Sequence, residues 1–417
     1  MTETSEAPLV DTLISADRLL TGPAGQQLTD AAVLVRGDRI VAVGGRDELR
    51  QQARAGSDEQ HHSDATLLPG LINTHLHLVA DASRDPFGAF RTSTPEAVFE
   101  AMADRALQAL DAGVTTIRDL GDGHGLAFAL RNEIASGTRP GPRILAAGTP
   151  LTPPDGHCWF LGGVVEGPDA IRARIRELAD AGADVIKVMA GGGQTTPGGA
   201  SPWESQFTLD ELRLIVAEAG AVGLPVAAHA HGTQTITDCV AAGVRTIEHC
   251  GWRGGSGKPD RRDDVARRMA AAGIYAGDTT PPNWPAFAAR IPFPPGHRLG
   301  DQLPWMDSLG VPIIIGTDSG MPGAVFNDFV SALEMYTELG FPNDRILQFA
   351  TANAADALGL SAVTGCLAAG LAADLLVVDG DPLTDLQTLR RPRLVMARGR
   401  IHHSSAQQSE EETTADV

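Results

Sequence analysis

Residues 225–249, PVAAHAHGTQTITDCVAAGVRTIEH, contain two apolar strand-like runs separated by a helical pattern that exits at Ala242-Gly243. The same unit of strand-like run, helical pattern and glycine-containing exit recurs through the middle of the chain. Alternation of this kind is typical of α/β folds with parallel strands. The strand-like runs are 67–74, 114–120, 143–147, 184–189, 225–230, 245–249, 274–278 and 311–317. Eight such units over about 290 residues favour a (β/α)8 TIM barrel over a doubly wound sheet.

Helix starts within this repeat can be recognised from their capping residues. Thr94 precedes Pro95, which supplies an N-cap and a proline at the first helical position, so a helix is predicted over 95–111. Thr208 and Glu211 have the spacing of a capping box ahead of an apolar-periodic run. Further helices are predicted over 263–272 and 343–358.

Both ends of the chain resemble β-structure rather than the alternating middle. Residues 12–20 and 31–44 are apolar runs, and a Gly-Asp turn at 37–38 divides the second run as in a β-hairpin. Residues 373–379 and 393–402 have the same character. We therefore expect a small composite β-sandwich domain from both termini. The predicted boundaries are 1–66 and 360–405 for this accessory domain, 67–359 for the barrel and 406–417 for a disordered tail.

The composition indicates an acidic globular protein. Lys plus Arg number 33 and Asp plus Glu 52, giving a net charge of −19. Such a surface repels phosphate backbones and anionic lipid, so no nucleic acid and no membrane is expected as a partner. The four cysteines form no CxxC pair, and free thiols are expected. The stretch 1–10, MTETSEAPLV, lacks the features of a secretory signal, and a cytoplasmic location is expected.

Polar residues at the ends of the strand-like runs are the candidate chemical groups. His75 and His77 are two positions apart, so on a strand they face the same side and can share one metal ion. Four later runs end with Lys187, with His229 and His231, with His249 and with Asp318. In a barrel the carboxyl ends of the strands converge on one rim. Each residue alone has an ordinary structural interpretation, but together they indicate a metal centre at that rim.

Five motifs follow one another in a fixed order along the chain. They are PGLINTHLHL (69–78), VIKVMAGGG (185–193), VAAHAHG (226–232), IEHC (247–250) and GTDSG (316–320). The set resembles the amidohydrolase superfamily of metal-dependent hydrolases, and the match continues to AADLLVV (372–378), so it covers nearly the whole chain. Within the superfamily the chain looks most like the binuclear branch with a carboxylated lysine. It is similar there to Xaa-Pro and Xaa-Arg dipeptidases and to imidazolonepropionase-related enzymes.

The resemblance implies a centre with two divalent metal ions. The implied ligands are His75, His77, Lys187, His229, His249 and Asp318. The first two histidines and the aspartate would share one ion, and the other two histidines would bind the second. Lys187, carboxylated by carbon dioxide to N6-carboxylysine, would bridge both ions, because carboxylation converts an amine into an anionic oxygen ligand. Zinc is the expected metal, since imidazole and carboxylate ligands suit it.

The implied reaction is hydrolysis of an amide or peptide C–N bond in a dipeptide, an N-acyl amino acid or a cyclic amide. A hydroxide that bridges the metals would attack the carbonyl, and Asp318 would act as general base and return the proton to the leaving nitrogen. His231 is assigned to oxyanion stabilisation and substrate binding, with His229 on the metal. Because these two histidines are two residues apart, the reversed assignment stays open.

Two loop residues bear on the substrate. His157, in PPDGHCW, is assigned to substrate binding because similar dipeptidases have a loop histidine near this position, and a solvent-exposed loop histidine is the alternative. Phe207 stands where several dipeptidase relatives carry a tyrosine, which argues against a simple dipeptidase. The expected partners are a small-molecule substrate and, in a homo-oligomer, further copies of the chain.

Other functions stay open at this point. A mononuclear deaminase or cyclic amidine hydrolase would need one metal, and Lys187 would then be structural. A biosynthetic amide-forming cyclase could use the same centre, because hydrolysis and condensation share a transition state. A catalytically silent barrel is disfavoured by the complete set of candidate ligands.

Overall fold

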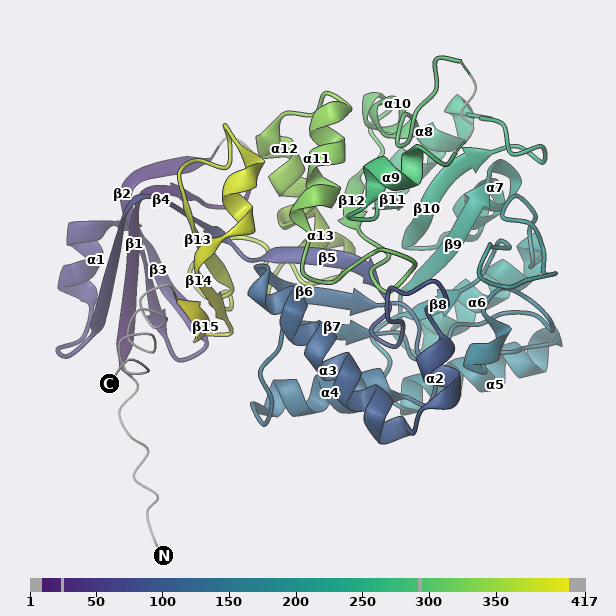
Figure 1. Cartoon of the computed structure of the whole chain (residues 1–417), viewed down its shortest axis with the longest axis horizontal. Helices are drawn as coiled ribbons and strands as arrows, with labels where there is room; N and C mark the ends of the chain where they lie inside the picture. The colour runs from purple at the N-terminus through teal and green to yellow at the C-terminus, as the bar shows by residue number, and fades with distance from the viewer. Residues whose placement is uncertain (1–9, 24–25, 292–294, 405–417) are drawn as a thin grey trace, which may run out of the picture. The chain divides into compact units, whose positions relative to one another are not determined.

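The computed structural model describes residues 10–23, 26–291 and 295–404, and it divides into two compact units (Figure 1). Unit 1 comprises Met1–Ile72, Leu110–Thr115 and Pro342–Val417, and unit 2 comprises Asn73–Ala109 and Thr116–Phe341. The tail predicted at 406–417 lies outside the described residues. In the described part of the chain, every helix is too short or too polar to span a bilayer.

Unit 1 is built on one seven-stranded sheet with the strand order β15-β14-β13-β4-β1-β2-β3. Its strands are β1 (Asp11–Leu20), β2 (Gln27–Arg36), β3 (Arg39–Gly45), β4 (Asp58–Pro69), β13 (Leu375–Asp379), β14 (Pro392–Ala397) and β15 (Arg400–Ser404). β4 runs parallel to β1 and antiparallel to β13, so it joins strands from the two ends of the chain. The run 31–44 forms a hairpin that turns at 37–38, as predicted.

Apolar side chains on both faces stabilise this sheet. One buried cluster draws on β1, β2, β4, β13 and β14, and includes Ile14, Val33, Leu67, Val377 and Leu394. On the other face, helix α1 (Arg46–Gln52) packs Leu49 against Leu13 and Leu34. Burial of these apolar side chains is the main favourable contribution to the folding free energy of unit 1. Between β1 and β2, Arg36 donates two hydrogen bonds of 2.7 and 2.8 Å to the buried carboxylate of Asp11.

The helix predicted over 343–358 is interrupted in the structure. It forms α12 (Asn343–Phe349) and α13 (Ala352–Ala357), separated at Thr351, whose φ of −135° is not helical. The Thr351 hydroxyl donates a 2.6 Å hydrogen bond to the carbonyl of Leu347, four residues earlier. Such a side-chain bond competes with the helical backbone bonds, which accounts for the break. Unit 1 also contains the short 3-10 helix η2 (Leu386–Arg390).

Unit 2 carries the alternating pattern. The strands of this pattern are β5 (Leu71–Leu76), β6 (Val114–Asp119), β7 (Arg143–Ala146), β8 (Ile186–Val188), β9 (Val226–Gly232), β10 (Thr246–Arg253), β11 (Tyr275–Thr279) and β12 (Ile313–Gly316), of which β5 and β6 have their first two residues within the bounds of unit 1. They form a three-stranded sheet, β5-β6-β7, and a five-stranded sheet, β12-β11-β10-β9-β8. Isolated parallel bridges join Leu76 of β5 to Ser319, which follows β12, and Val188 of β8 to Leu151, which follows β7. Each predicted strand of the repeat is present, except that 67–69 belong to β4.

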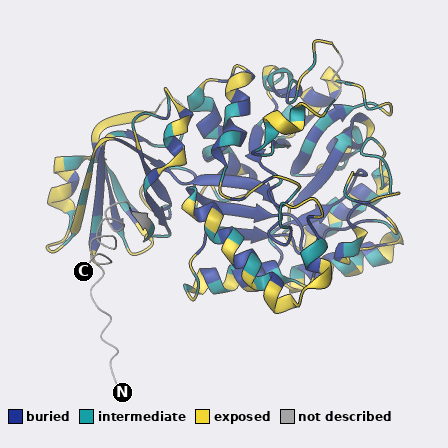
Figure 2. Cartoon of the chain, in the orientation of Figure 1, coloured by how far each residue is buried: buried dark blue, intermediate teal, exposed yellow. Residues whose placement is uncertain are grey.

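Helices connect these strands and cover them. They are α2 (Gly88–Thr92), α3 (Pro95–Asp111), α4 (Leu126–Ser136), η1 (Trp159–Leu161), α5 (Gly167–Asp180), α6 (Leu209–Ala221), α7 (Thr233–Ala242), α8 (Asp263–Ala271), α9 (Trp284–Ala288), α10 (Gln302–Ser308) and α11 (Val330–Glu338). Figure 2 shows buried strands and helices with one buried and one exposed face. The capping box of α6 is confirmed: Thr208 Oγ1 accepts from the Glu211 amide, and the Glu211 carboxylate accepts from the Thr208 amide.

A tight turn in unit 1 gives a test of this packing. Gly399, between β14 and β15, has a φ of 73°, and an added Cβ would lie 1.8 Å from the Gly37 carbonyl oxygen. We expect Gly399→Ala to lower the free energy of unfolding by about 2 kcal/mol or more, measured by urea denaturation. Gly45→Ala is the matched control, because Gly45 is exposed and nothing lies within 4 Å of its added Cβ. Equal urea midpoints for the two variants would contradict this view of the turn.

Candidate metal centre

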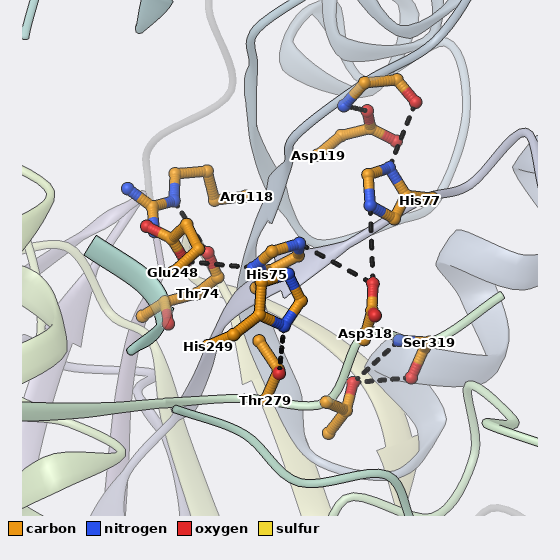
Figure 3. A network of polar contacts seen from close by, with 12 residues as sticks. Thr74, His75, His77, Arg118, Asp119, Glu248, His249, Thr279, Asp318 and Ser319 are labelled. Carbon is orange, nitrogen blue, oxygen red and sulfur yellow. Dashed lines mark hydrogen bonds and ion pairs between the residues drawn. The ribbon is translucent and has the colours of Figure 1, made fainter. Parts of the chain in front are cut away.

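The first group of candidate ligands lies where β5 and β12 end (Figure 3). His75 and His77 approach the same carboxylate oxygen: their Nε2 atoms lie 3.6 and 3.4 Å from Asp318 Oδ1. The backbone amide of Asp318 donates a 2.9 Å hydrogen bond to the His75 carbonyl, which ties the two strand ends together. Asp318 has a φ of 53°, in the left-handed region, where a side chain is aimed away from the ordinary strand direction.

The second group comprises three histidines at the ends of β9 and β10. One ring nitrogen from each of His229, His231 and His249 lies within 4.8 Å of the others. His249 is 4.4 Å from both other rings, centroid to centroid, and 5.1 Å from the ring of His75. The two groups are therefore adjacent. The structure brings His231 as close to the group as His229, so proximity alone does not separate their predicted roles.

Each of the four histidines predicted as ligands has one ring nitrogen in a hydrogen bond with the surrounding protein. The pairs are His75 Nδ1 with Glu248 Oε2 (2.9 Å), His77 Nδ1 with Gly121 O (3.2 Å), His229 Nε2 with Gly192 O (3.0 Å) and His249 Nδ1 with Thr279 Oγ1 (2.6 Å). A carbonyl or carboxylate oxygen can only accept a hydrogen bond, so in His75, His77 and His229 the bonded nitrogen carries the hydrogen and the other nitrogen keeps a lone pair. Histidines that bind metals are held in this way.

Lys187 lies in the middle of β8 and is 1% exposed. Its Nζ has no hydrogen-bond partner among the described residues. Burial lowers the pKa of Lys187 to about 8, although the negative charges of Glu248 and Asp318 oppose this shift. An amine that loses its proton near neutral pH has the lone pair needed to react with carbon dioxide.

Glu248 and Arg118 form a buried ion pair beside the centre. Arg118 Nη2 donates a 2.7 Å hydrogen bond to Glu248 Oε1, and its Nε donates to the carbonyl of Thr74 at 2.6 Å. Burial raises the pKa of Glu248, but Arg118 and His75 outweigh it and the pKa is lowered to about 2. Glu248 was not among the residues predicted for the site. The available signal was an acidic residue in one apolar strand and a basic residue in another.

His157 and Phe207 are both buried. His157 is 6% exposed, so the alternative of a solvent-exposed loop histidine is wrong. Its ring lies 4.8 Å from that of His229, centroid to centroid, and burial, followed by the charge of His231, lowers its pKa to about 4. Gly193 permits this position, because an added Cβ there would lie 2.2 Å from His157 Cε1. Phe207, which replaces the tyrosine expected in dipeptidase relatives, is 5% exposed.

The sequence profile of the Amidohydrolase family matches residues 66–402. The chain belongs to the amidohydrolase family. A second profile, for the imidazolonepropionase-like composite domain of bacteria, matches residues 31–54. The chain is a hydrolase that acts on carbon–nitrogen bonds, and metal binding is typical of its family.

Relatives of this amidohydrolase include enzymes of several specificities. It is 27% identical to ochratoxinase of Aspergillus niger, over 92% of this chain and 84% of the relative. It is also 27% identical to imidazolonepropionase of Deinococcus deserti, over 93% and 95% of the two chains. Among solved structures, a Xaa-Pro dipeptidase with bound methionine in the active site aligns with a TM-score of 0.81 and 27% identity, covering 94% of this chain and 100% of the other.

The close approach of Gly193 to His157 allows a test at the centre. We expect Gly193→Ala to reduce kcat/KM about 100-fold, because the added methyl group displaces the imidazole by roughly an ångström. The assay uses whichever N-acyl amino acid, dipeptide or lactam the wild type hydrolyses best, and circular dichroism checks folding. Gly255→Ala is the control, since nothing lies within 4 Å of its added Cβ. Unchanged kcat/KM in Gly193→Ala would show that the position of His157 does not matter.

Proposed function

We propose that this amidohydrolase is a binuclear metal-dependent enzyme that cleaves an amide or peptide C–N bond of a small substrate. The observation that carries the proposal is the pair of adjacent ligand groups, His75 with His77 and Asp318, and His229 with His249. Such clusters of imidazole and carboxylate groups are rarely buried together unless they bind metal.

The residues present fit two divalent ions. The hydrogen bonds to His75, His77 and His229 leave a lone pair on the other ring nitrogen of each, and the Nε2 atoms of His75 and His77 lie next to Asp318. Lys187, as N6-carboxylysine, would supply the bridging anion. Zinc ions held there would supply a nucleophile from water at neutral pH and polarise the carbonyl of the substrate.

The surroundings of Lys187 favour the binuclear centre over the mononuclear alternative. In a mononuclear deaminase this lysine would be structural, and a buried structural lysine needs a hydrogen-bonding or ionic partner. Its Nζ has no hydrogen-bond partner among the described residues. Carboxylation removes the ammonium charge and gives the site an anion, which favours the binuclear arrangement.

The side chains of this chain supply the proton transfers. Burial raises the pKa of Asp318, but the close approach of His77 and of His75 outweighs burial and lowers the pKa, so the carboxylate is ionised at neutral pH. Asp318 would take the proton of the attacking water and deliver it to the leaving nitrogen. His231, a member of the second group, would donate a hydrogen bond to the oxyanion, and His157 would contact the substrate.

The substrate is proposed from the range that the relatives cover. Their names include a Xaa-Pro dipeptidase, imidazolonepropionases and an ochratoxinase. We propose a dipeptide, an N-acyl amino acid or a cyclic amide, and favour the last two because Phe207 cannot donate the hydrogen bond that a tyrosine there would. An activity screen over these three classes tests the choice directly.

The finer points of the fold are also proposals. The bridges of Leu76 to Ser319 and of Leu151 to Val188 support a closed (β/α)8 TIM barrel made by β5 to β12. The apolar cluster shared by strands from both ends of unit 1 supports a composite β-sandwich there. We retain 1–66, 67–359 and 360–405 as the proposed domain boundaries.

Metal content tests the proposed centre. We expect close to two zinc ions per chain by mass spectrometry of the metals, and loss of at least one ion and of activity in His75→Ala. His61→Ala is the control, because His61 pairs with Ser15 in unit 1. A chelator-treated protein that is free of metal and fully active would refute the proposal.

The role of Lys187 has a separate test, because the chain has only two lysines, Lys187 and Lys258. In protein equilibrated with 13C-bicarbonate and zinc, we expect one carbamate resonance by 13C NMR, absent in Lys187→Ala and retained in Lys258→Ala. Lys187→Ala should lose the second ion and most of its activity, and added short carboxylates should restore part of it. Two tightly bound ions in Lys187→Ala would count against a bridging role.

A further inference from the structure

Glu248 occupies a position from which it can act on the centre without touching the substrate. It lies in β10 directly before His249, and its side chain is fully buried. Oε1 accepts hydrogen bonds from Arg118 and from the hydroxyl of Thr246. Oε2 accepts from Nδ1 of His75 at 2.9 Å. Every contact of the carboxylate is therefore with a donor from unit 2, as Figure 3 shows for Arg118 and His75.

The carboxylate has little freedom to change this arrangement. An added Cβ at Gly277, on the neighbouring strand β11, would lie 2.7 Å from Glu248 Oε2, so the backbone of β11 closes that side. Arg118 is held in turn by the Thr74 carbonyl and by Thr246 Oγ1, at 2.6 and 3.2 Å. The guanidinium thus links three strands and fixes which oxygen of Glu248 faces His75.

This geometry determines where His75 carries its proton. An ionised carboxylate can only accept, so Nδ1 of His75 must be the donor. The lone pair is then on Nε2, the atom 3.6 Å from Asp318 Oδ1. With the opposite tautomer, Nε2 would carry a hydrogen and could not bind a metal. The guanidinium keeps the carboxylate ionised, because arginine remains protonated at any physiological pH.

We propose that Glu248 is a positioning residue that holds His75 in the tautomer competent for metal binding, and that Arg118 sets the orientation of Glu248. The inference rests on the proposed metal centre and goes beyond it, because neither residue is a ligand or contacts the substrate. Arg118 and Glu248 act here as one unit, so the effect of changing Glu248 depends on whether Arg118 is present.

The substitution Glu248→Gln separates this role from simple bracing. Glutamine has one acceptor oxygen and one amide donor group. Arg118 can only donate, so the oxygen must face Arg118 and the amide group must face His75. His75 then has to accept at Nδ1, which moves its proton to Nε2 and blocks the metal-binding nitrogen.

Removing the guanidinium as well should reverse this effect. In the double variant Arg118→Met with Glu248→Gln, nothing forces the glutamine oxygen away from His75. The amide can turn, its oxygen accepts from Nδ1, and Nε2 regains its lone pair. A purely structural role predicts the opposite order, since the double variant loses one more hydrogen-bonding residue.

The test measures the dissociation constants of Zn2+ by competition with a chelator, on the full chain, for the wild type, both variants and Asp11→Asn. Asp11 is the matched control, because it is a fully buried carboxylate that is hydrogen-bonded to Arg36 in unit 1. We expect Glu248→Gln to weaken one of two zinc sites about 10- to 100-fold. The double variant should recover most of this loss, and Asp11→Asn should bind zinc as the wild type does.

The outcomes are distinguishable. If the wild type binds no zinc, the proposed metal centre itself fails and the inference fails with it. If the wild type binds two ions and Glu248→Gln binds them equally well, only the inference is overturned. A double variant that binds zinc more weakly than Glu248→Gln also overturns it. Should Glu248→Gln not fold, the double variant decides: near-wild-type affinity supports the proposal, and a loss of about 10-fold or more overturns it.

Discussion

The interior of unit 2 excludes water from several ionisable side chains, and the arrangement of the centre depends on how each of them is neutralised or paired. A buried charge is costly unless hydrogen bonds and an opposite charge surround it. Arg118 and Glu248 meet this condition as a pair, each with further polar contacts. Lys187 meets it only by losing its proton or by reacting, since its Nζ has no hydrogen-bond partner among the described residues. The same constraint therefore produces a buried ion pair and a buried amine of lowered pKa within one unit.

Backbone conformation at the strand ends supports the positions of these groups. His249, Cys250, Trp252 and Asp318 all have positive φ, which costs about 1–3 kcal/mol for each residue that is not glycine. These four residues lie at the end of β10 and just after β12. There the regular alternation of strand side chains would point successive residues to opposite faces. The left-handed conformations let the side chains of His249 and Asp318 reach the centre, while the side chains of their neighbours make other contacts.

Periodicity and capping residues were sufficient to predict most elements of unit 2, because local signals determine them. The capping box at Thr208 is one such signal, and the alternation of apolar runs with helices is another. Local signals failed where a distant contact decides the outcome. Residues 67–69 resemble the start of β5 but pair with β1 and β13 as part of β4, and Thr351 breaks a helix that its neighbours favour. The candidate ligands were predictable from motif order. Glu248 was not, because its meaning depends on Arg118, which lies 130 residues away in the sequence.

The near absence of lysine has a practical consequence for handling the protein. Of its two side-chain amines, Lys187 is buried and Lys258 is exposed in the loop that follows β10. Reagents that acylate amines at the surface will therefore meet a single lysine. Lys258 thus offers one defined lysine for attaching a fluorophore or a solid support.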